Sequence, residues 1–213
     1  PELDPEKTLN TDLTICWSPT SRISWSNTIF YTQLSDAIVR APFSLPDGST
    51  TFIDGPDTLA VVGNINAQKA RVYGISSRLA ASISSRLNLD VTYNWTRGRI
   101  VSSETSPLSH IPPSYGKIAL NYSSERHKSS IQWRYNLAKP LSEYGGSEDN
   151  PEFATPEGSL AWNTFNLYHK WMINDHINID IAIENAFDIH YRTFASGVSA
   201  PGRNLIITGR FLF

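Results

Sequence analysis

Apolar and polar residues alternate strictly along several stretches of this chain. In residues 88–96 (NLDVTYNWT) every odd position is apolar or aromatic, and every even position is polar. The same period of two appears in residues 177–184 and in the closing segment, residues 205–213. Strict alternation predicts β-strands that have one apolar face and one polar face.

About nine such strands are predicted along the chain. They cover residues 9–17, 23–39, 70–83, 87–97, 115–122, 131–137, 162–173, 177–187 and 204–213. Short turns alternate with long connections rich in Gly, Pro and Ser. The long connections are predicted at residues 41–60, 98–114, 138–161 and 192–203.

The connection lengths indicate the environment of the strands. Hairpin loops of soluble domains usually have about 2–5 residues, whereas long loops on one rim and tight turns on the other are typical of a transmembrane β-barrel. Aromatic residues gather near both ends of the predicted strands, as expected at two membrane interfaces. Alternation alone does not say which face is buried, so a soluble β-sandwich is the alternative.

Composition is compatible with this prediction. The mean hydropathy is −0.28, and no stretch approaches the roughly 20 apolar residues of a membrane helix. A barrel strand gives only half of its residues to lipid, so this does not argue against a membrane protein. A net charge of −2 gives no electrostatic case for nucleic-acid binding, and the single Cys16 excludes an internal disulfide.

The odd number of strands suggests a part of a larger protein. Bacterial single-chain barrels have an even number of strands. With the last strand ending at the periplasmic rim, nine strands would place Pro1 outside the cell, which an exported barrel disfavours. The first residues also lack the pattern of a signal peptide. We therefore expect residues 1–213 to be the C-terminal portion of a barrel.

Several segments resemble TonB-dependent outer-membrane receptors. The similar segments, in chain order, are Leu3-Asp4-Pro5-Glu6-Lys7-Thr8, Phe30-Tyr31 with Leu34-Ser35-Asp36-Ala37-Ile38, Asn64-Ile65-Asn66-Ala67 with Ala70-Arg71-Val72-Tyr73-Gly74-Ile75, Pro107-Leu108 with Ile111-Pro112-Pro113, Glu184-Asn185-Ala186-Phe187-Asp188-Ile189-His190-Tyr191-Arg192, and Pro201-Gly202-Arg203-Asn204. One departure is Ser76, where the family usually has Glu. The resemblance covers nearly the whole chain.

This resemblance implies a barrel of about twenty-two strands with a plug domain that this chain lacks. It implies an outer-membrane location in a Gram-negative bacterium and uptake of a scarce ligand such as a ferric siderophore, haem, cobalamin or a glycan. Its partners would be outer-membrane lipid, the missing strands and plug, TonB through the plug, and the barrel assembly machinery. The alternatives are a soluble all-β binding or adhesion module and part of a porin without a plug.

Ligand contacts are expected in the long connections. No enzymatic role is expected. Pairing with neighbouring charges explains the rows of polar residues on the strands more simply than catalysis does. The five histidines lie on different elements and lack the spacing of a metal site. No cofactor is predicted. Arginine binds carboxylates in a bidentate manner and aromatic rings stack on flat ligands. The candidate ligand residues by position are Arg97, Arg99, His110, Tyr144, Trp162 and Arg192.

The last strand carries a second candidate function. Phe211 and Phe213 lie at alternate positions and end the chain in an aromatic carboxy terminus. This ending resembles the signal by which the outer-membrane assembly machinery recognises its substrates. An exposed alternating edge can add to another sheet, which gives the resemblance a physical basis.

Overall fold

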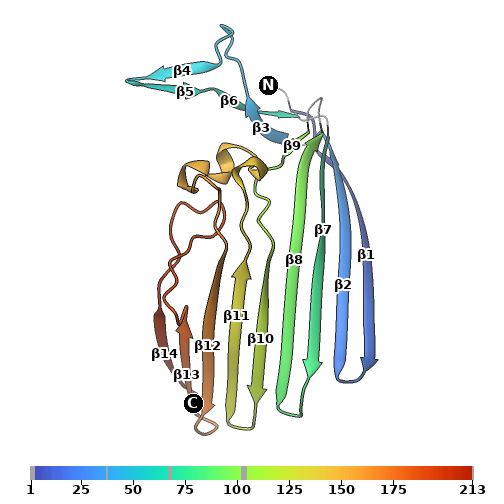
Figure 1. Cartoon of the computed structure of the whole chain (residues 1–213), viewed down its shortest axis with the longest axis vertical. Helices are drawn as coiled ribbons and strands as arrows, with labels where there is room; N and C mark the ends of the chain where they lie inside the picture. Colours follow the sequence, from blue (N-terminus) through green and yellow to red (C-terminus); the bar gives the residue numbers. More distant parts are fainter. Residues whose placement is uncertain (1–2, 37, 67–68, 102–104, 213) are drawn as a thin grey trace.

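One large antiparallel β-sheet dominates the computed structural model, which describes residues 3–36, 38–66, 69–101 and 105–212 (Figure 1). Nine strands follow one another as neighbours, in the order β1 (Lys7–Thr20), β2 (Ile23–Ser35), β7 (Lys69–Ser82), β8 (Leu87–Val101), β10 (Tyr115–Ser123), β11 (His127–Asn136), β12 (Trp162–Met172), β13 (Ile177–Glu184) and β14 (Asn204–Phe211). The predicted up-and-down arrangement of about nine strands is confirmed.

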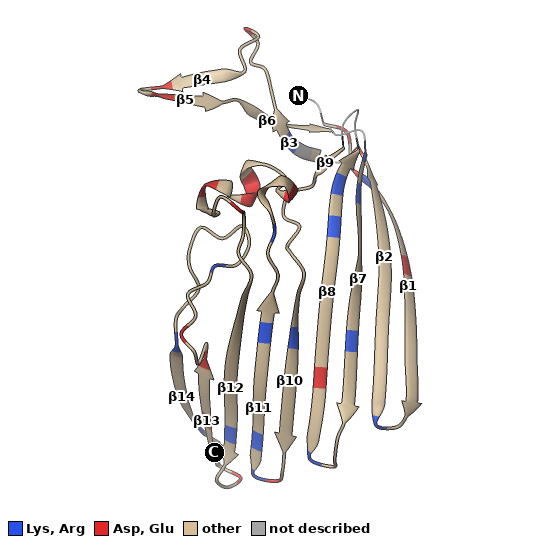
Figure 2. Ribbon diagram, viewed as in Figure 1, with Lys and Arg blue, Asp and Glu red and all other residues tan. Residues whose placement is uncertain are grey.

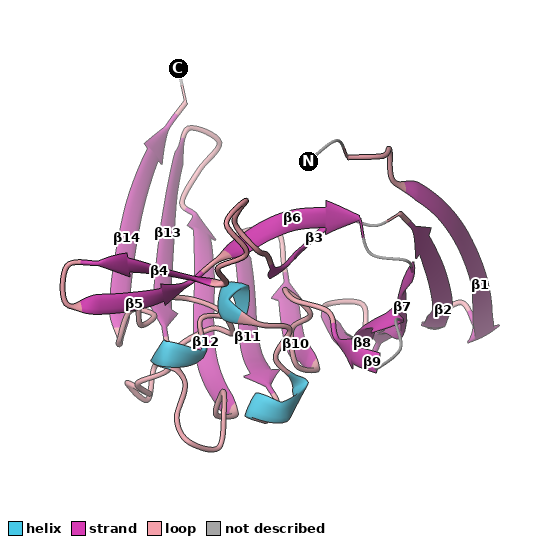
Figure 3. Cartoon of the chain, turned by 90° about the horizontal axis from the view of Figure 1, so that it is seen from above, coloured by secondary structure: helices cyan, strands magenta, loops and turns pink. Residues whose placement is uncertain are grey.

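Seen from above, the sheet curves into an open trough (Figure 3). Among the described residues, β1 pairs with β2 alone and β14 pairs with β13 alone, so the two edges of the sheet do not meet. The long connections lie at one end of the trough and the tight turns at the other (Figure 1). The chain therefore forms a curved section of a barrel wall.

The sheet has no apolar core of its own. In the described part of the chain, the buried hydrophobic residues are Ala70 and Ala119. Large apolar side chains on the strands are exposed instead, among them Leu13, Ile131 and Ile207. A soluble sandwich must bury one apolar face of each sheet against another layer. The sandwich alternative is not supported.

The strand register joins polar positions into one continuous face. Ser76 lies beside Asn94 with a hydrogen bond of 2.9 Å, and Asp90 accepts hydrogen bonds from Arg78 at 3.2 Å and from Asn121 at 3.1 Å. Further polar contacts on this face join Thr14 to Thr28, Ser82 to Asn88, Ser130 to Asn121 and Tyr168 to Glu184. These side chains satisfy one another across neighbouring strands.

The opposite face is apolar, and exposure distinguishes the two faces on β12. Thr164 and Asn166, on the polar face, are 3% and 4% exposed, whereas Phe165 and Leu167, at the alternate positions, are 37% and 39% exposed. Side chains crowd on the inner side of a curved sheet and spread apart on its outer side. The polar face therefore lies inside the trough and the apolar face lies outside, as in membrane barrels.

The first long connection is more ordered than the sequence predicts. The strand predicted at residues 23–39 ends at Ser35, because Asp36 adopts a left-handed φ of 58° that no β-ladder accommodates. Two antiparallel strand pairs, one enclosed by the other, lie in and around the region predicted as loop, residues 41–60. They are formed by β3 (Ile38–Pro42) with β6 (Val62–Asn66) and by β4 (Thr51–Asp54) with β5 (Asp57–Ala60).

Two other long connections also contain secondary structure. β8 continues to Val101, past its predicted end, and pairs there with the short β9 (Thr105–Pro107). The connection after β11 folds into three 3₁₀ turns, η1 (Leu141–Glu143), η2 (Ser147–Asp149) and η3 (Pro151–Phe153). Acidic residues gather on these turns, while charges on the strands are scattered (Figure 2). Among the described helices, none is long and apolar enough to cross a membrane.

β13 ends three residues before the predicted position, at a tight bend. Asn185 has a φ of 49° and is 3% exposed. Its side-chain amide donates to the Ile189 carbonyl at 2.8 Å, and its side-chain oxygen accepts the Ile189 N–H at 2.9 Å. Asp188, with a φ of 56°, accepts the Arg203 N–H at 2.7 Å. This Asn-Ala-Phe-Asp segment therefore shapes the connection between β13 and β14.

Candidate functional site

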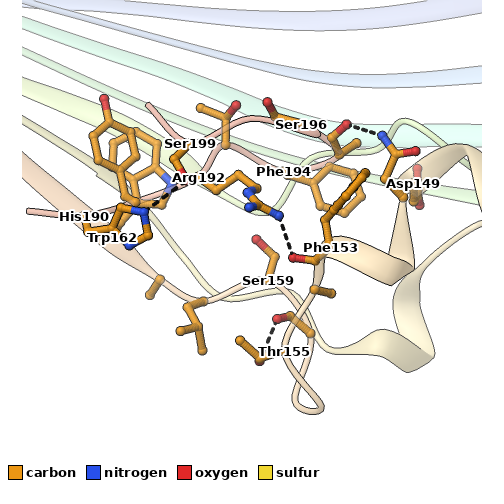
Figure 4. Close-up of a pocket in the computed structure, with 18 of the residues that line it drawn as sticks. Asp149, Phe153, Thr155, Ser159, Trp162, His190, Arg192, Phe194, Ser196 and Ser199 are labelled. Atoms are coloured by element: carbon orange, nitrogen blue, oxygen red, sulfur yellow. Dashed lines mark hydrogen bonds between the residues drawn. The ribbon is translucent and has the colours of Figure 1, made fainter. Parts of the chain in front are cut away.

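A cavity of about 340 Å³ lies between two of the long connections (Figure 4). One wall comes from the segment between β11 and β12, and the other from the segment between β13 and β14. Three of the residues predicted to contact a ligand line this cavity: Tyr144, Trp162 and Arg192. The structure thus brings together half of a set chosen from positions far apart in the sequence.

The cavity wall combines flat aromatic rings with a guanidinium group. The Trp162 and Tyr191 rings lie 4.3 Å apart at an interplanar angle of 33°. Arg192 donates to the Phe153 carbonyl at 2.9 Å, and its guanidinium carbon lies 5.3 Å from the centre of the Phe153 ring. Figure 4 shows Arg192 between Phe153 and His190. Such a surface can stack on flat groups and pair with anionic oxygens.

A buried ion pair holds this end of the molecule together. Lys139 is 7% exposed and Asp149 is 1% exposed, and the Lys139 ammonium lies 3.8 Å from Asp149 Oδ2. The same ammonium lies 4.1 Å from the centre of the Phe194 ring and donates to the Ile111 carbonyl. Burial lowers the pKa of the Lys139 amine, and the nearby Asp149 carboxylate opposes that effect.

The Asp149 carboxylate also ties two loops together through their backbones. It accepts the His110 N–H and the Gly145 N–H, each at 2.7 Å. The loops approach so closely that a Cβ at position 145 would lie 2.0 Å from the Ser109 nitrogen, and only glycine fits there. Asn150 then joins the third loop by donating to the Ala195 carbonyl at 2.7 Å. Three connections therefore form one cap beside the cavity.

Arg97 and Arg99, two further predicted ligand residues, lie outside this cavity. Glu143 pairs with both: Oε1 lies 2.9 Å from Arg97 and Oε2 lies 2.5 Å from Arg99. The hydrogen bond from Arg99 is the main reason that the pKa of Glu143 is lowered. The two arginines line a separate cavity of about 220 Å³ with Leu108 and Ile111. Through Glu143, the two arginines hold η1 against β8.

His110 is also placed away from the larger cavity. Its backbone has a left-handed φ of 61° and donates to Asp149, while its ring nitrogen Nε2 lies 3.6 Å from Glu148. Within the described residues, no group of three or more His, Cys, Asp and Glu side chains could hold a metal ion. The hydrogen bond from its backbone to Asp149 and the ring contact with Glu148 both hold His110 beside η2.

Sequence reasoning missed most of the cap. Lys139, Asp149, Phe153 and Phe194 lie in irregular segments, where no periodicity marks a residue as buried. One signal was available: Tyr191 stands next to Arg192 in the segment that resembles the receptor family. The contacts of His110 with Asp149 and of Arg192 with Phe153 each join residues 39 positions apart and depend on the tertiary structure.

The structure describes Phe211 of the predicted assembly signal but not Phe213. Phe211 ends β14 and is 65% exposed. It pairs with Ile177 and shares the apolar outer face of the trough. Phe213 lies outside the described residues.

A curved antiparallel sheet with a polar inner face, an apolar outer face and long loops at one end defines a β-barrel wall of an outer-membrane protein. The family model for TonB dependent receptor-like β-barrels matches residues 1–186. The chain therefore belongs to this family, whose members are transport receptors rather than enzymes. The location in the outer membrane follows from this membership.

Named relatives agree with this assignment. The chain is 24% identical over 206 residues to the iron-regulated outer membrane virulence protein of Vibrio cholerae, covering 95% of this chain and 30% of that protein. The solved copper transporter OprC superposes with a TM-score of 0.78 at 16% identity, covering 100% of this chain and 33% of that one. The siderophore receptor PirA from Acinetobacter baumannii superposes with a TM-score of 0.70 at 13% identity, covering 100% and 32%. The chain thus spans about a third of the length of these proteins.

Proposed function

We propose that this chain supplies part of the barrel wall, with its loops, to a receptor that imports chelated iron by TonB-dependent transport. Family membership and the resemblance to an iron-regulated outer membrane protein support the transport class. Similar solved structures include a siderophore receptor and an iron transporter. Among the ligands that the sequence left open, a ferric siderophore is the one we select.

The loop cavity is the observation that carries this proposal. Its aromatic rings suit the flat groups of an organic chelate, and Arg192 suits anionic oxygens that such a chelate presents. A bare metal ion needs several converging ligands. The described residues offer no such cluster, and the chain has a single methionine. We therefore assign Tyr144, Trp162 and Arg192 to ligand contact.

The other partners follow from the same proposal. Residues 1–213 would complete a barrel with strands contributed by the rest of the receptor, and a plug domain would fill the polar interior. TonB would act on the plug and not on these strands. The barrel assembly machinery would recognise β14 with Phe211 and Phe213.

An uptake assay with the full-length receptor tests the ligand assignment. Cells that depend on this receptor are supplied with radiolabelled iron bound to catecholate or hydroxamate siderophores, with haem, or with free copper. Replacing both Arg192 and Trp162 by Ala should reduce siderophore-iron uptake by about tenfold or more, since stacking and charge-assisted hydrogen bonds each contribute on the order of 1–3 kcal/mol.

Arg86→Ala serves as the matched control, because Arg86 lies in the tight turn at the opposite end of the strands. Its uptake should equal that of the wild type. Uptake of haem or copper in place of any siderophore would overturn the proposed ligand. Equal siderophore uptake by the double variant and the control would remove the cavity from the proposal.

The assembly role has a separate test in the full-length receptor. Deleting Phe213 should lower the amount of folded receptor in the outer membrane, measured by its heat-modifiable gel mobility. Tyr144→Ala, which removes an aromatic ring from a loop, should leave that amount unchanged. A Phe213 deletion that assembles normally would rule out a targeting role for the C-terminal aromatic residue.

A further inference from the structure

Three rings stack across β11 and β12 near the tight turns. The His127 and His169 rings lie 5.4 Å apart at 25°, and the His127 and Trp171 rings lie 6.1 Å apart at 19°. Ser129 Oγ lies 2.8 Å from His169 Nδ1. Neither the ligand cavity nor the polar interior of the trough accounts for this group.

The strand register places this stack on the outer, apolar face. Residues of one strand that are two apart share a face, so His169 and Trp171 lie on the same side as Leu167. Leu167 pairs with Ile131 on one side and with Ile183 on the other. These neighbours form the apolar surface that a barrel turns towards lipid.

The depth of the stack corresponds to the edge of that apolar surface. His127 is the first residue of β11, and Trp171 is the last but one of β12. Tight turns mark the periplasmic rim of a barrel. Trp171, 44% exposed, and Tyr122, 39% exposed, therefore lie where interfacial aromatic residues are expected. The two imidazoles lie among them, at the level of the lipid headgroups.

We propose that His127, His169 and Ser129 form a binding site for the phosphate of a phospholipid in the periplasmic leaflet. When the Ser129 hydroxyl donates to His169 Nδ1, the ring carries its proton on Nε2 and can donate to a phosphate oxygen. His127 offers a second ring N–H in the adjacent stacked plane. Trp171 and Leu167 would contact the start of the acyl chains.

The geometry favours a lipid phosphate over a metal ion at this position. A metal requires ring nitrogens that converge on one point, whereas these rings are stacked nearly parallel. The apolar residues beside the stack would contact acyl chains, so they favour a phosphate that belongs to a lipid. This inference rests on the membrane location of the family and not on the identity of the imported ligand.

Native mass spectrometry of the full-length receptor in mild detergent tests the site. Dioleoyl phosphatidylglycerol and dioleoyl glycerol, which lacks phosphate, are added separately to the wild type and to a His127→Leu/His169→Leu variant. Leucine suits a lipid-facing position, so the variant is expected to fold. The wild type should retain about three- to tenfold more phosphatidylglycerol than the variant, as loss of one or two hydrogen bonds implies. Retention of dioleoyl glycerol should be equal.

Two further variants serve as a control and as a conservative replacement. His110→Leu/His190→Leu makes the same chemical change in the long loops and should retain phosphatidylglycerol as the wild type does. His127→Gln/His169→Gln keeps side-chain N–H donors and should restore part of the retention. Equal retention of phosphatidylglycerol by the wild type and the leucine variant would overturn the proposal. A wild type that does not prefer the phosphate lipid over dioleoyl glycerol would overturn it as well.

Discussion

At the scale of single residues, a few polar side chains determine the shape of the loop end. Asp149 and Lys139 are buried as a pair and connect three segments that are distant in sequence. Asn185 satisfies its own buried amide within one tight bend. Each of these residues would be costly if unpaired, because a buried polar group without a partner loses its hydration. Their pairing explains why irregular segments adopt one arrangement.

The first prediction concerns the Asp149 carboxylate. Asp149→Ala should leave the His110 and Gly145 N–H groups without an acceptor and Lys139 without its counter-charge. Leaving a buried donor unsatisfied costs about 1–3 kcal/mol, so both amides should exchange with solvent about tenfold faster or more. Hydrogen exchange of the full-length receptor measures this. Glu152→Ala in the neighbouring turn is the control, and unchanged exchange in Asp149→Ala would refute the bridging role.

The second prediction concerns pH. The pKa of Glu143 lies below its ordinary value of 4.5 because Arg99 donates a hydrogen bond to it and both arginines attract its charge. Its contribution to stability is therefore fully present above the unfolded value and is lost as the pH falls through the folded pKa. The contact of η1 with β8 should loosen in acid below about pH 4.5, as hydrogen exchange can show. In Glu143→Gln the same loosening should be present at neutral pH and should not change with acid.

At the scale of elements, alternation predicted that the nine strands of the large sheet exist, but it predicted their ends less well. β12 begins at its predicted residue and ends one residue early, because β11 pairs with it from Trp162 to Trp171 and β13 pairs with it from Leu167 to Met172. β2 and β13 end early because a single residue, Asp36 or Asn185, leaves the β-region. In the other direction, β11 begins four residues before its predicted start and β8 ends four residues after its predicted end. The two strand pairs between β2 and β7 were missed because Gly, Pro and Ser are frequent there, although short strands can still pair between these residues.

The third prediction tests which face meets lipid. Val91 pairs with Leu79 and Ile118 on the outer face, so Val91→Arg should cost ~2–4 kcal/mol of unfolding free energy near the middle of the membrane. Thr92 lies between Arg78 and Lys117 on the inner face, and Thr92→Glu should cost little because both neighbours are cations. Val91→Glu is the matched change and should destabilise. Equal unfolding free energies for Val91→Glu and Thr92→Glu in lipid vesicles would reverse the assignment of faces.

At the scale of the whole molecule, the sheet is open. β1 and β14 each have one edge without a partner in the described chain, and the outer face is apolar. Unpaired backbone groups are not tolerated in hydrocarbon, and an exposed apolar edge promotes association. The stability of this section therefore depends on strands that complete the barrel.

The fourth prediction follows from these open edges. The 213-residue chain, expressed alone and refolded in detergent, should associate or aggregate rather than form a stable monomer. Co-refolding with the remaining strands of the receptor should produce a monomeric, heat-modifiable species. Light scattering and gel mobility distinguish these outcomes. A monodisperse monomer of this chain with a cooperative unfolding transition, with or without detergent, would be incompatible with an open barrel section.

The sequence by itself determined the nine strands of the large sheet, their alternating faces and the contrast between short turns and long connections. These features depend on a local period of two and on turn residues, both of which can be read from neighbouring positions. Only the tertiary structure decided that Tyr144, Trp162 and Arg192 share a cavity while Arg97 and Arg99 pair with Glu143. The loops have no period, and their shape follows from contacts such as that between Asp149 and His110, whose partners are 39 residues apart.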